Sequence, residues 1–498
     1  KHNSVRVTSL RIGREVTAEA KMNDSLVRPI QRQPSSNFDS NFTTDSTATV
    51  QRLDVFGSSS NSHVAEAVQN TEKFEKPTYA NSIRVKVKVK ELTLLLPIQP
   101  ADQEKTISWL FQQVRERYFS MFLLSPTLTL STQDGTILCG SDIIKTILQD
   151  GDLLTANVCA WERPKLEDRY AQACKLCLTT TNTQILTLLQ KTDQSGHLQL
   201  SDMGLGYSHL QPVFQALHDH KILTELRING NRLGDAGIAS LMKLLNSLPH
   251  LKILSLETNC ISAEGIQTMS SALTSELCLQ ALSTLSLSHN CLDDNVAEFL
   301  ASVITRLPKL CSLSLCSCNF SYRLFSPSLL QAFQEQRFEH LNMSENNIGD
   351  KGLGLLLPVL HSDCLRQLDI SYTCSTSDQD VFQYLENFIS NEQCCLLELS
   401  LAGNHLSPAD VTLINRLPML AKSLHSLILS QNQNINNKSL QKLLYLSADK
   451  NSNLDEITAR GCTLSSPLDQ ELLDAFTSKM SSLVPLKKFV FTCRALTS

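Results

Sequence analysis

The sequence predicts an α/β solenoid of stacked repeats, preceded by a small α+β domain and a disordered N-terminal linker. Three observations support this prediction. A unit of the form L-x-x-L-x-[L/I]-x-x-N recurs from about residue 198 to the end of the chain. A segment that alternates apolar and basic residues begins near residue 82, and the residues before it are rich in Ser, Asn, Thr and Gln.

Bulk composition excludes several classes of function. The 498 residues exceed one ordinary core, so several domains or a repeat array are expected. A formal net charge of -5 argues against general binding to phosphate backbones. No apolar run is long enough for a membrane helix, so no membrane partner is expected. Because the first residue is Lys1 rather than Met, we expect a fragment and infer no targeting signal.

The sixteen cysteines are not spaced like a disulfide framework. Several of them recur at repeat positions, namely Cys260, Cys291, Cys318 and Cys462. This placement suits a reducing compartment in which thiols act as small apolar fillers. Cys174 and Cys177 form one C-x-x-C without a second ligand pair nearby, and on a helix both thiols would share an apolar face. We therefore predict no metal site and no cofactor.

Residues 1–80 are interpreted as a disordered linker. Their polar composition buries too little apolar surface to offset the chain entropy lost on folding. Within this region only residues 5–12 have a strand-like pattern.

The next segment alternates strictly, which predicts a half-buried strand with valines on one face and basic residues on the other. The two sets are Val85, Val87 and Val89, and Arg84, Lys86, Lys88 and Lys90. The later elements are expected in this order: a strand at 92–99, a helix at 106–122, strands at 127–132 and 137–139, a short helix at 141–148 and a strand at 150–158. The basic face is interpreted as solvated and as a deterrent to edge pairing, with an acidic partner as the alternative.

This order of elements resembles the ubiquitin-like β-grasp fold over residues 82–161. The "QDGT" turn at 133–136 and the segment "DGDLLTANV" carry the resemblance. The last strand continues into "CAWERPKL" without a terminal Gly-Gly. An interaction or packing domain is therefore expected, and not a conjugated modifier.

The repeat array follows a helical cap expected at 163–196 and occupies residues 197–498 with about ten repeats. Equivalent apolar positions lie about 29 residues apart on average. They are Leu226, Leu254, Leu285, Leu313, Leu341, Leu368, Leu399, Leu427, Ile457 and Phe489. A strand plus a full helix in such a unit resembles the ribonuclease-inhibitor type of leucine-rich repeat, which implies a horseshoe-shaped α/β solenoid.

An asparagine ends most repeat strands, and its buried amide is expected to satisfy backbone groups of adjacent coils. These residues are Asn231, Asn259, Asn290, Asn346, Asn404 and Asn432. Cys318, Thr373 and Cys462 take the equivalent place in other repeats, where the ladder should weaken without breaking.

Strand alternation predicts which side chains line the concave face of the solenoid. The predicted partner-binding residues are Glu225, Arg227, Asn229, Glu257, Ser286, Ser314, His340, Asn342, Asp369, Glu398, Glu456 and Arg460. Small residues dominate the middle, which suits a protein partner and neither a nucleic-acid track nor a small-molecule pocket. The alternative interpretation is a serine ladder that serves strand solubility alone.

Two further expectations concern competing sites. The insertion at 320–337 is a rival docking site if Tyr322, Leu324 and Phe325 are exposed. The chain contains no G-x-S-x-G, H-E-x-x-H or G-x-x-x-x-G-K-[S/T] motif, so we predict that it is not an enzyme.

The order of linker, ubiquitin-like module and repeats resembles the C-terminal part of the Tonsoku-like protein family. The segments "IRVKVKVKELTLLLPI", "DGDLLTANVCAW" and "LQLSDMGLG" carry this resemblance over residues 82–498. It implies tetratricopeptide and ankyrin repeats in a region absent from this chain, where the ankyrin repeats would read histone H4. It also implies nuclear, chromatin-associated work with the large Mms-twenty-two-like subunit, which helps to load the strand-exchange recombinase during homologous recombination at damaged or stalled replication forks.

Two other readings of the domain composition remain open. One is a cytosolic tubulin-folding cofactor, in which the ubiquitin-like module follows the repeats. The other is a ribonuclease-inhibitor-like binder or an innate-immune receptor.

Overall fold

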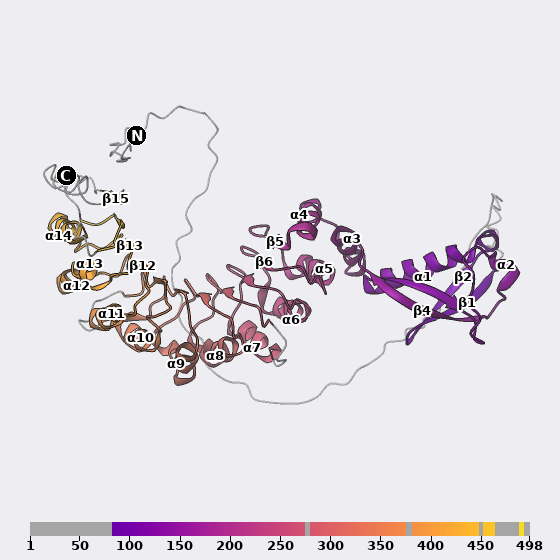
Figure 1. Ribbon diagram of the computed structural model, residues 1–498, viewed down its shortest axis with the longest axis horizontal. Coiled ribbons are helices and arrows are strands. Elements are labelled where there is room, and N and C mark those ends of the chain that lie inside the picture. The colour runs from indigo at the N-terminus through magenta and orange to yellow at the C-terminus, as the bar shows by residue number, and fades with distance from the viewer. Residues whose placement is uncertain (1–81, 274–278, 375–380, 448–451, 464–487, 493–498) are drawn as a thin grey trace, which may run out of the picture. The chain divides into compact units, whose positions relative to one another are not determined.

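The computed structural model describes residues 82–273, 279–374, 381–447, 452–463 and 488–492. The expected linker at 1–80, with its strand-like segment at 5–12, lies outside these residues. The described residues form a four-stranded sheet and an eleven-stranded parallel sheet (Figure 1). No helix among them is long and apolar enough to cross a membrane.

The four-stranded sheet has the order β2-β1-β4-β3. Its strands are β1 (Ile83–Val89), β2 (Leu92–Ile98), β3 (Ser125–Ser131) and β4 (Leu153–Glu162), and its helical segments are η1 (Pro100–Asp102), α1 (Ile107–Phe122) and α2 (Ile144–Ile147). β1 pairs antiparallel with β2 and parallel with β4. The valines of β1 are buried and share a core with Ile107, Leu110 and Val114 of α1. The predicted alternation is therefore confirmed.

Two expectations for this sheet are wrong. β1 has a neighbouring strand on each side, so its exposed cations Arg84, Lys86 and Lys88 do not protect a sheet edge. The segment at 137–139 is not a strand, because it makes only an isolated bridge between Ile137 and Ser131.

Two helices precede the repeats, α3 (Leu166–Leu176) and α4 (Thr183–Ser195). The side chain of Asn182 caps α4 by accepting from the backbone N–H groups of Gln184 and Ile185, so the expected helical cap consists of two helices. Tyr170 and Ile185 are buried in the same apolar cluster as the repeats. These helices therefore cover the first apolar layer of the solenoid.

The repeat strands pair in register from end to end. They are β5 (His197–Gln199), β6 (Glu225–Arg227), β7 (Ile253–Ser255), β8 (Thr284–Ser286), β9 (Ser312–Ser314), β10 (His340–Asn342), β11 (Gln367–Asp369), β12 (Glu398–Ser400), β13 (Ser426–Ile428), β14 (Glu456–Arg460) and β15 (Lys488–Thr492). Leu226 pairs with Leu254, and the same alignment continues to Ile457 and Phe489. The predicted repeat phase is thus confirmed.

Helical segments return the chain between strands, and Figure 1 shows α6 to α10 along one side of the sheet. The α-helices are α5 (Tyr207–Leu217), α6 (Gly234–Leu245), α7 (Ala263–Ala272), α8 (Ala297–Thr305), α9 (Pro327–Glu335), α10 (Gly349–Leu356), α11 (Val381–Ile389), α12 (Pro408–Ile414), α13 (Leu417–Leu420) and α14 (Asn437–Ser447). The shorter turns are η2 (Asp294–Val296), η3 (Tyr322–Leu324) and η4 (Leu357–Val359). In α6, Ile238, Leu241 and Leu245 are buried at helical spacing.

The asparagine ladder bonds adjacent coils as expected. The Asn346 amide donates to the carbonyls of Leu315 and Met343, and its Oδ1 accepts from the backbone of Cys318. Where cysteine replaces asparagine, the Cys318 thiol lies 3.5 Å from the Leu287 carbonyl and 3.4 Å from the Cys316 carbonyl. A thiol thus supplies one weak donor where the asparagine amide supplies two donors and an acceptor.

The insertion at 320–337 does not expose the apolar surface that we expected. Leu324 and Phe325 are buried, whereas Tyr322 is 42% exposed. This segment forms η3 and α9, which occupy the place of a repeat helix and direct the two apolar side chains inward. The insertion therefore offers Tyr322 alone of the three residues to a partner.

The prediction that cysteines at repeat positions act as small apolar fillers holds for two of the four. Cys318 and Cys462 are fully buried at the ladder position itself. Cys260 and Cys291 are exposed, because the next residues, Ile261 and Leu292, fill the apolar layer instead. Cys174 is buried on α3, as expected, whereas Cys177 is the residue after the end of that helix and is only partly buried.

Candidate concave interaction face

The concave face is the side of the eleven-stranded sheet that is turned away from the repeat helices. The three-residue strands bury their central residue, as in β6, where Leu226 is fully buried between the partly exposed Glu225 and Arg227. Strand alternation directs the residues on either side of the central one to the same face, and in β7, β8 and β12 the serine that follows it is itself buried. The residues predicted from the sequence therefore lie on one surface.

Charged groups pair at the N-terminal end of this face. The Arg227 guanidinium donates to the Glu225 carboxylate, and His197 of β5 lies 3.0 Å from the other Glu225 oxygen. The hydrogen bond from Arg227 is the main cause that lowers the pKa of Glu225. These groups partly neutralise one another, so Glu225 and Arg227 are less available to a partner than free charges would be.

Glu257 organises the next repeats. It accepts from the hydroxyl of Ser286 at 2.6 Å and from that of Ser255 at 3.3 Å, while its backbone N–H donates to Oδ1 of Asn229. Ser286 is only 5% exposed. It therefore positions Glu257 and presents little surface of its own.

Small polar side chains occupy the middle of the concave face. The Ser314 hydroxyl lies 2.8 Å from that of Ser288, and Asn342 accepts from the hydroxyl of Ser344. His340 is partly buried, and its Nδ1 has no hydrogen-bond partner among the residues that the structure describes. A polar atom without a partner is costly to bury, so His340 is the residue here with most to gain from a new donor or acceptor.

Acidic side chains dominate the later repeats. Asp369 accepts from the backbone of Ser371, and Glu398 accepts from Gln367. Glu456 is partly buried on β14, and Arg460 at the end of that strand is exposed. The predicted set as a whole has more carboxylates than guanidinium groups, so the face is acidic.

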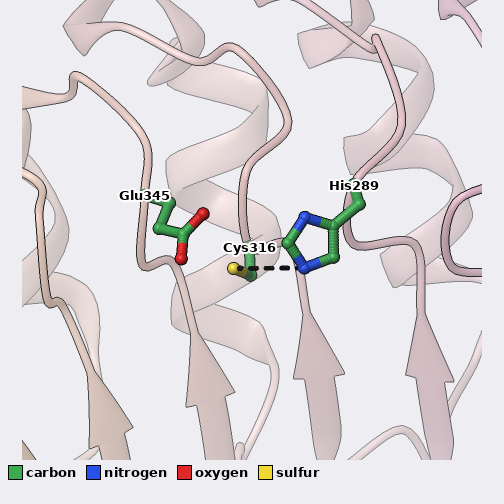
Figure 2. Close-up of side chains that lie close together, drawn as sticks. All are labelled: His289, Cys316 and Glu345. Carbon is green, nitrogen blue, oxygen red and sulfur yellow. Dashed lines mark hydrogen bonds between the residues drawn. The ribbon is translucent and has the colours of Figure 1, made fainter. Parts of the chain in front are cut away.

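One group of side chains on this face was not predicted. His289, Cys316 and Glu345 come from three successive repeats, and their ligand atoms all lie within 4.8 Å of one another (Figure 2). Cys316 Sγ is 3.9 Å from His289 Nε2. Burial is the main cause that raises the pKa of the Cys316 thiol, and the carboxylates of Glu345, Asp369 and Glu257 raise it further.

These three side chains form no local sequence motif, because metal-ligand motifs are spaced a few residues apart whereas His289 and Cys316 are 27 residues apart. In a solenoid, residues one repeat apart are neighbours in space, so the register of the strands is the signal that could have found them. Searching equivalent positions of consecutive repeats for His, Cys and Glu would have brought these three together.

Comparisons with known proteins agree with the repeat architecture. A family model described as "Leucine Rich repeat" matches residues 221–242, 247–270 and 338–357. A ribonuclease inhibitor from Sus scrofa is 33% identical over 184 residues, which cover 35% of this chain and 37% of that protein. The chain thus contains leucine-rich repeats.

Longer matches extend beyond the repeat region. A Tonsoku-like protein from Bos taurus is 32% identical over 406 residues, which cover 80% of this chain and 29% of that protein. A Tonsoku-like protein from Danio rerio is 31% identical over 409 residues, with 80% and 29% covered. The chain therefore spans about three tenths of the length of these relatives.

Proposed function

The chain is a homologue of the vertebrate Tonsoku-like proteins, and from this premise we propose that it is a non-enzymatic docking module of a nuclear, chromatin-associated complex. In this proposal the complex promotes homologous recombination at stalled or damaged replication forks. The module docks the large Mms-twenty-two-like subunit and thereby helps to load the strand-exchange recombinase. Contact with histones belongs to a region outside this chain.

The observation that carries the proposal is the acidic concave face with small side chains at its centre. Ser314 and Asn342 leave room for a helix or backbone to approach the strands closely. Glu257, Asp369 and Glu398 lie along the same face and favour a partner segment rich in Lys or Arg. Complementary charge of this kind raises association rates and fixes the register of a partner.

We further propose that residues 82–161 act as a ubiquitin-like β-grasp module within the same protein. The parallel pairing of β1 with β4 at the centre of the sheet, with α1 packed on one face, supports this assignment. Lys86 and Lys88 expose their charges from β1 on the other face. That face offers a second surface, of opposite charge, to an acidic segment of a partner.

A second candidate function is that of a ribonuclease-inhibitor-like binder of a basic protein. The match to the inhibitor from Sus scrofa, 33% identical over 184 residues, favours it. This candidate uses the same acidic face and predicts a different partner. Identifying what binds the chain therefore separates the two proposals.

The test is a pull-down from nuclear extract with the 498-residue chain, read out by mass spectrometry. One variant combines Glu257→Arg, Asp369→Lys and Glu398→Lys on the concave face. A matched control combines Glu264→Arg, Glu298→Lys and Glu335→Lys, which are exposed on α7, α8 and α9 and change the net charge equally. Melting curves establish that all three proteins are folded.

Recovery of the Mms-twenty-two-like subunit by the parent and the control, but not by the concave variant, is the expected result. Equal recovery by all three proteins would place docking elsewhere on the chain. Failure of every folded protein to recover that subunit would contradict the proposed complex and favour the second candidate.

A further inference from the structure

We propose that His289, Cys316 and Glu345 form a zinc site on the concave face, with Nε2, Sγ and a carboxylate oxygen as ligands. This inference does not depend on the proposed function. It rests on how three consecutive repeats bring nitrogen, sulfur and oxygen donors to one point (Figure 2).

Strand register produces the arrangement. Cys316 follows β9, whereas His289 and Glu345 follow the neighbouring strands β8 and β10. Neighbouring strands lie about 4.8 Å apart, so the backbone positions of His289 and Glu345, two strands apart, are roughly 10 Å from each other. Both side chains are long enough to meet over the middle repeat, where the position equivalent to theirs holds the small Ser317.

The distances suit a tetrahedral metal. Zinc bonds of about 2.3 Å to sulfur and 2.0–2.1 Å to nitrogen place the two atoms about 3.6 Å apart. The Cys316 Sγ to His289 Nε2 distance is 3.9 Å, close to this value. Glu345 and His289 are exposed, so their side chains can move the remaining fraction of an ångström, while the buried Cys316 provides a fixed ligand.

The donor set favours zinc over calcium or magnesium. A thiolate and an imidazole are ligands for borderline and soft metals, whereas calcium and magnesium take oxygen ligands almost exclusively. Three protein ligands leave a fourth tetrahedral position for water or for a side chain of a bound protein. On binding, the Cys316 thiol gives its proton to solvent as the sulfur–metal bond forms.

The surrounding charge also favours a cation. Glu257 and Asp369 both act electrostatically on Cys316, in addition to Glu345. Without a bound cation these carboxylates only repel one another, whereas a divalent cation offsets their charge. Activation of Cys316 as a nucleophile would instead need a cationic neighbourhood.

The test titrates the chain with Zn²⁺ in competition with a chromophoric chelator, and with Co²⁺ to detect the thiolate-to-metal absorption band. The variants are Cys316→Ser, His289→Asn and Glu345→Gln. Ser288 and Ser344 occupy positions equivalent to Cys316, and Asn tolerates the left-handed backbone of His289, so both variants should fold. Cys260→Ser removes an exposed thiol outside the cluster and is the matched control.

We expect one equivalent of metal that gives the thiolate band and raises the melting temperature of the parent and of Cys260→Ser. Each cluster variant should weaken this binding at least about 10-fold, and Cys316→Ser should abolish the band. An absent band in the parent, or unchanged affinity in Cys316→Ser or His289→Asn, would overturn the site. Equal losses in Cys260→Ser and Cys316→Ser would likewise overturn it, because they would indicate scattered binding to surface thiols.

Discussion

The side-chain amide of Asn290 donates to the carbonyl of Leu256 in the preceding repeat over 2.9 Å. The same amide donates to Leu287, and Oδ1 of Asn290 accepts from the backbone N–H groups of Asn259 and Ile261. One buried side chain thus supplies hydrogen-bond partners to backbone N–H and C=O groups of two adjacent repeats, which could not otherwise pair them.

Replacement of Asn290 by alanine should therefore be strongly destabilising. Asn290→Ala leaves several buried donors and acceptors without partners, which should lower the free energy of unfolding by roughly 2–5 kcal/mol. Asn295→Ala, at an exposed position of η2, should change it by less than about 0.5 kcal/mol. Urea unfolding followed by circular dichroism measures both, and equal values for the two variants would contradict the ladder account.

Substitutions of Leu324 and Tyr322 test which side chains of the insertion at 320–337 belong to the core. Leu324 is fully buried, so Leu324→Ala should cost about 2–5 kcal/mol through lost packing and a residual cavity. Tyr322→Ala removes an exposed ring and should change stability by no more than about 0.5 kcal/mol. Thermal unfolding distinguishes them. A small effect of Leu324→Ala would mean that this side chain is on the surface, as the sequence had suggested.

Gly403 and Tyr372 hold equivalent left-handed positions in adjacent repeats, with φ of 64° and 53°. A Cβ at Gly403 would lie 2.1 Å from the Tyr372 ring. Gly403→Ala should therefore cost more than the roughly 1–2 kcal/mol of backbone strain alone. In a Tyr372→Ser background only the strain should remain. A double-mutant cycle measures the difference, and strict additivity would show that the ring does not oppose the new methyl group.

Acid sensitivity should arise in part from His220. Its ring is buried, its Nε2 has no hydrogen-bond partner in the described part of the chain, and burial lowers its pKa. Arg169 and Arg163 lower that pKa further, while Asp193 opposes them. In the unfolded chain His220 has a pKa of about 6.5, so as the pH falls the unfolded chain binds this proton before the folded chain does. The contribution of His220 to the free energy of unfolding is therefore complete above about pH 6.5 and is lost as the pH falls.

The melting temperature should accordingly fall between about pH 7.5 and pH 5.5, and the fall should be smaller in His220→Gln. Differential scanning calorimetry across this range provides the comparison. An identical pH dependence in parent and variant would show that His220 does not take part.

The repeat phase was predictable because a leucine at a fixed interval must face a shared core, and each expected strand position from Leu226 to Phe489 is paired. Exposure at the ends of strands was harder to predict. Cys260 is exposed because Ile261 takes the inward place, a choice that depends on one residue of register. The sequence pattern alone could not show that the Ser286 hydroxyl donates to Glu257, since side-chain pairing across repeats depends on rotamers.

The central claim is that the acidic concave face docks a basic segment of the Mms-twenty-two-like subunit. The most direct test is the dissociation constant of that purified subunit for the chain at several salt concentrations. Asp369→Lys combined with Glu398→Lys should weaken binding at least about 10-fold and reduce its salt dependence. Glu264→Lys with Glu298→Lys, exposed on the helical side, should change it less than about threefold. Equal affinity for both folded double variants would contradict the claim.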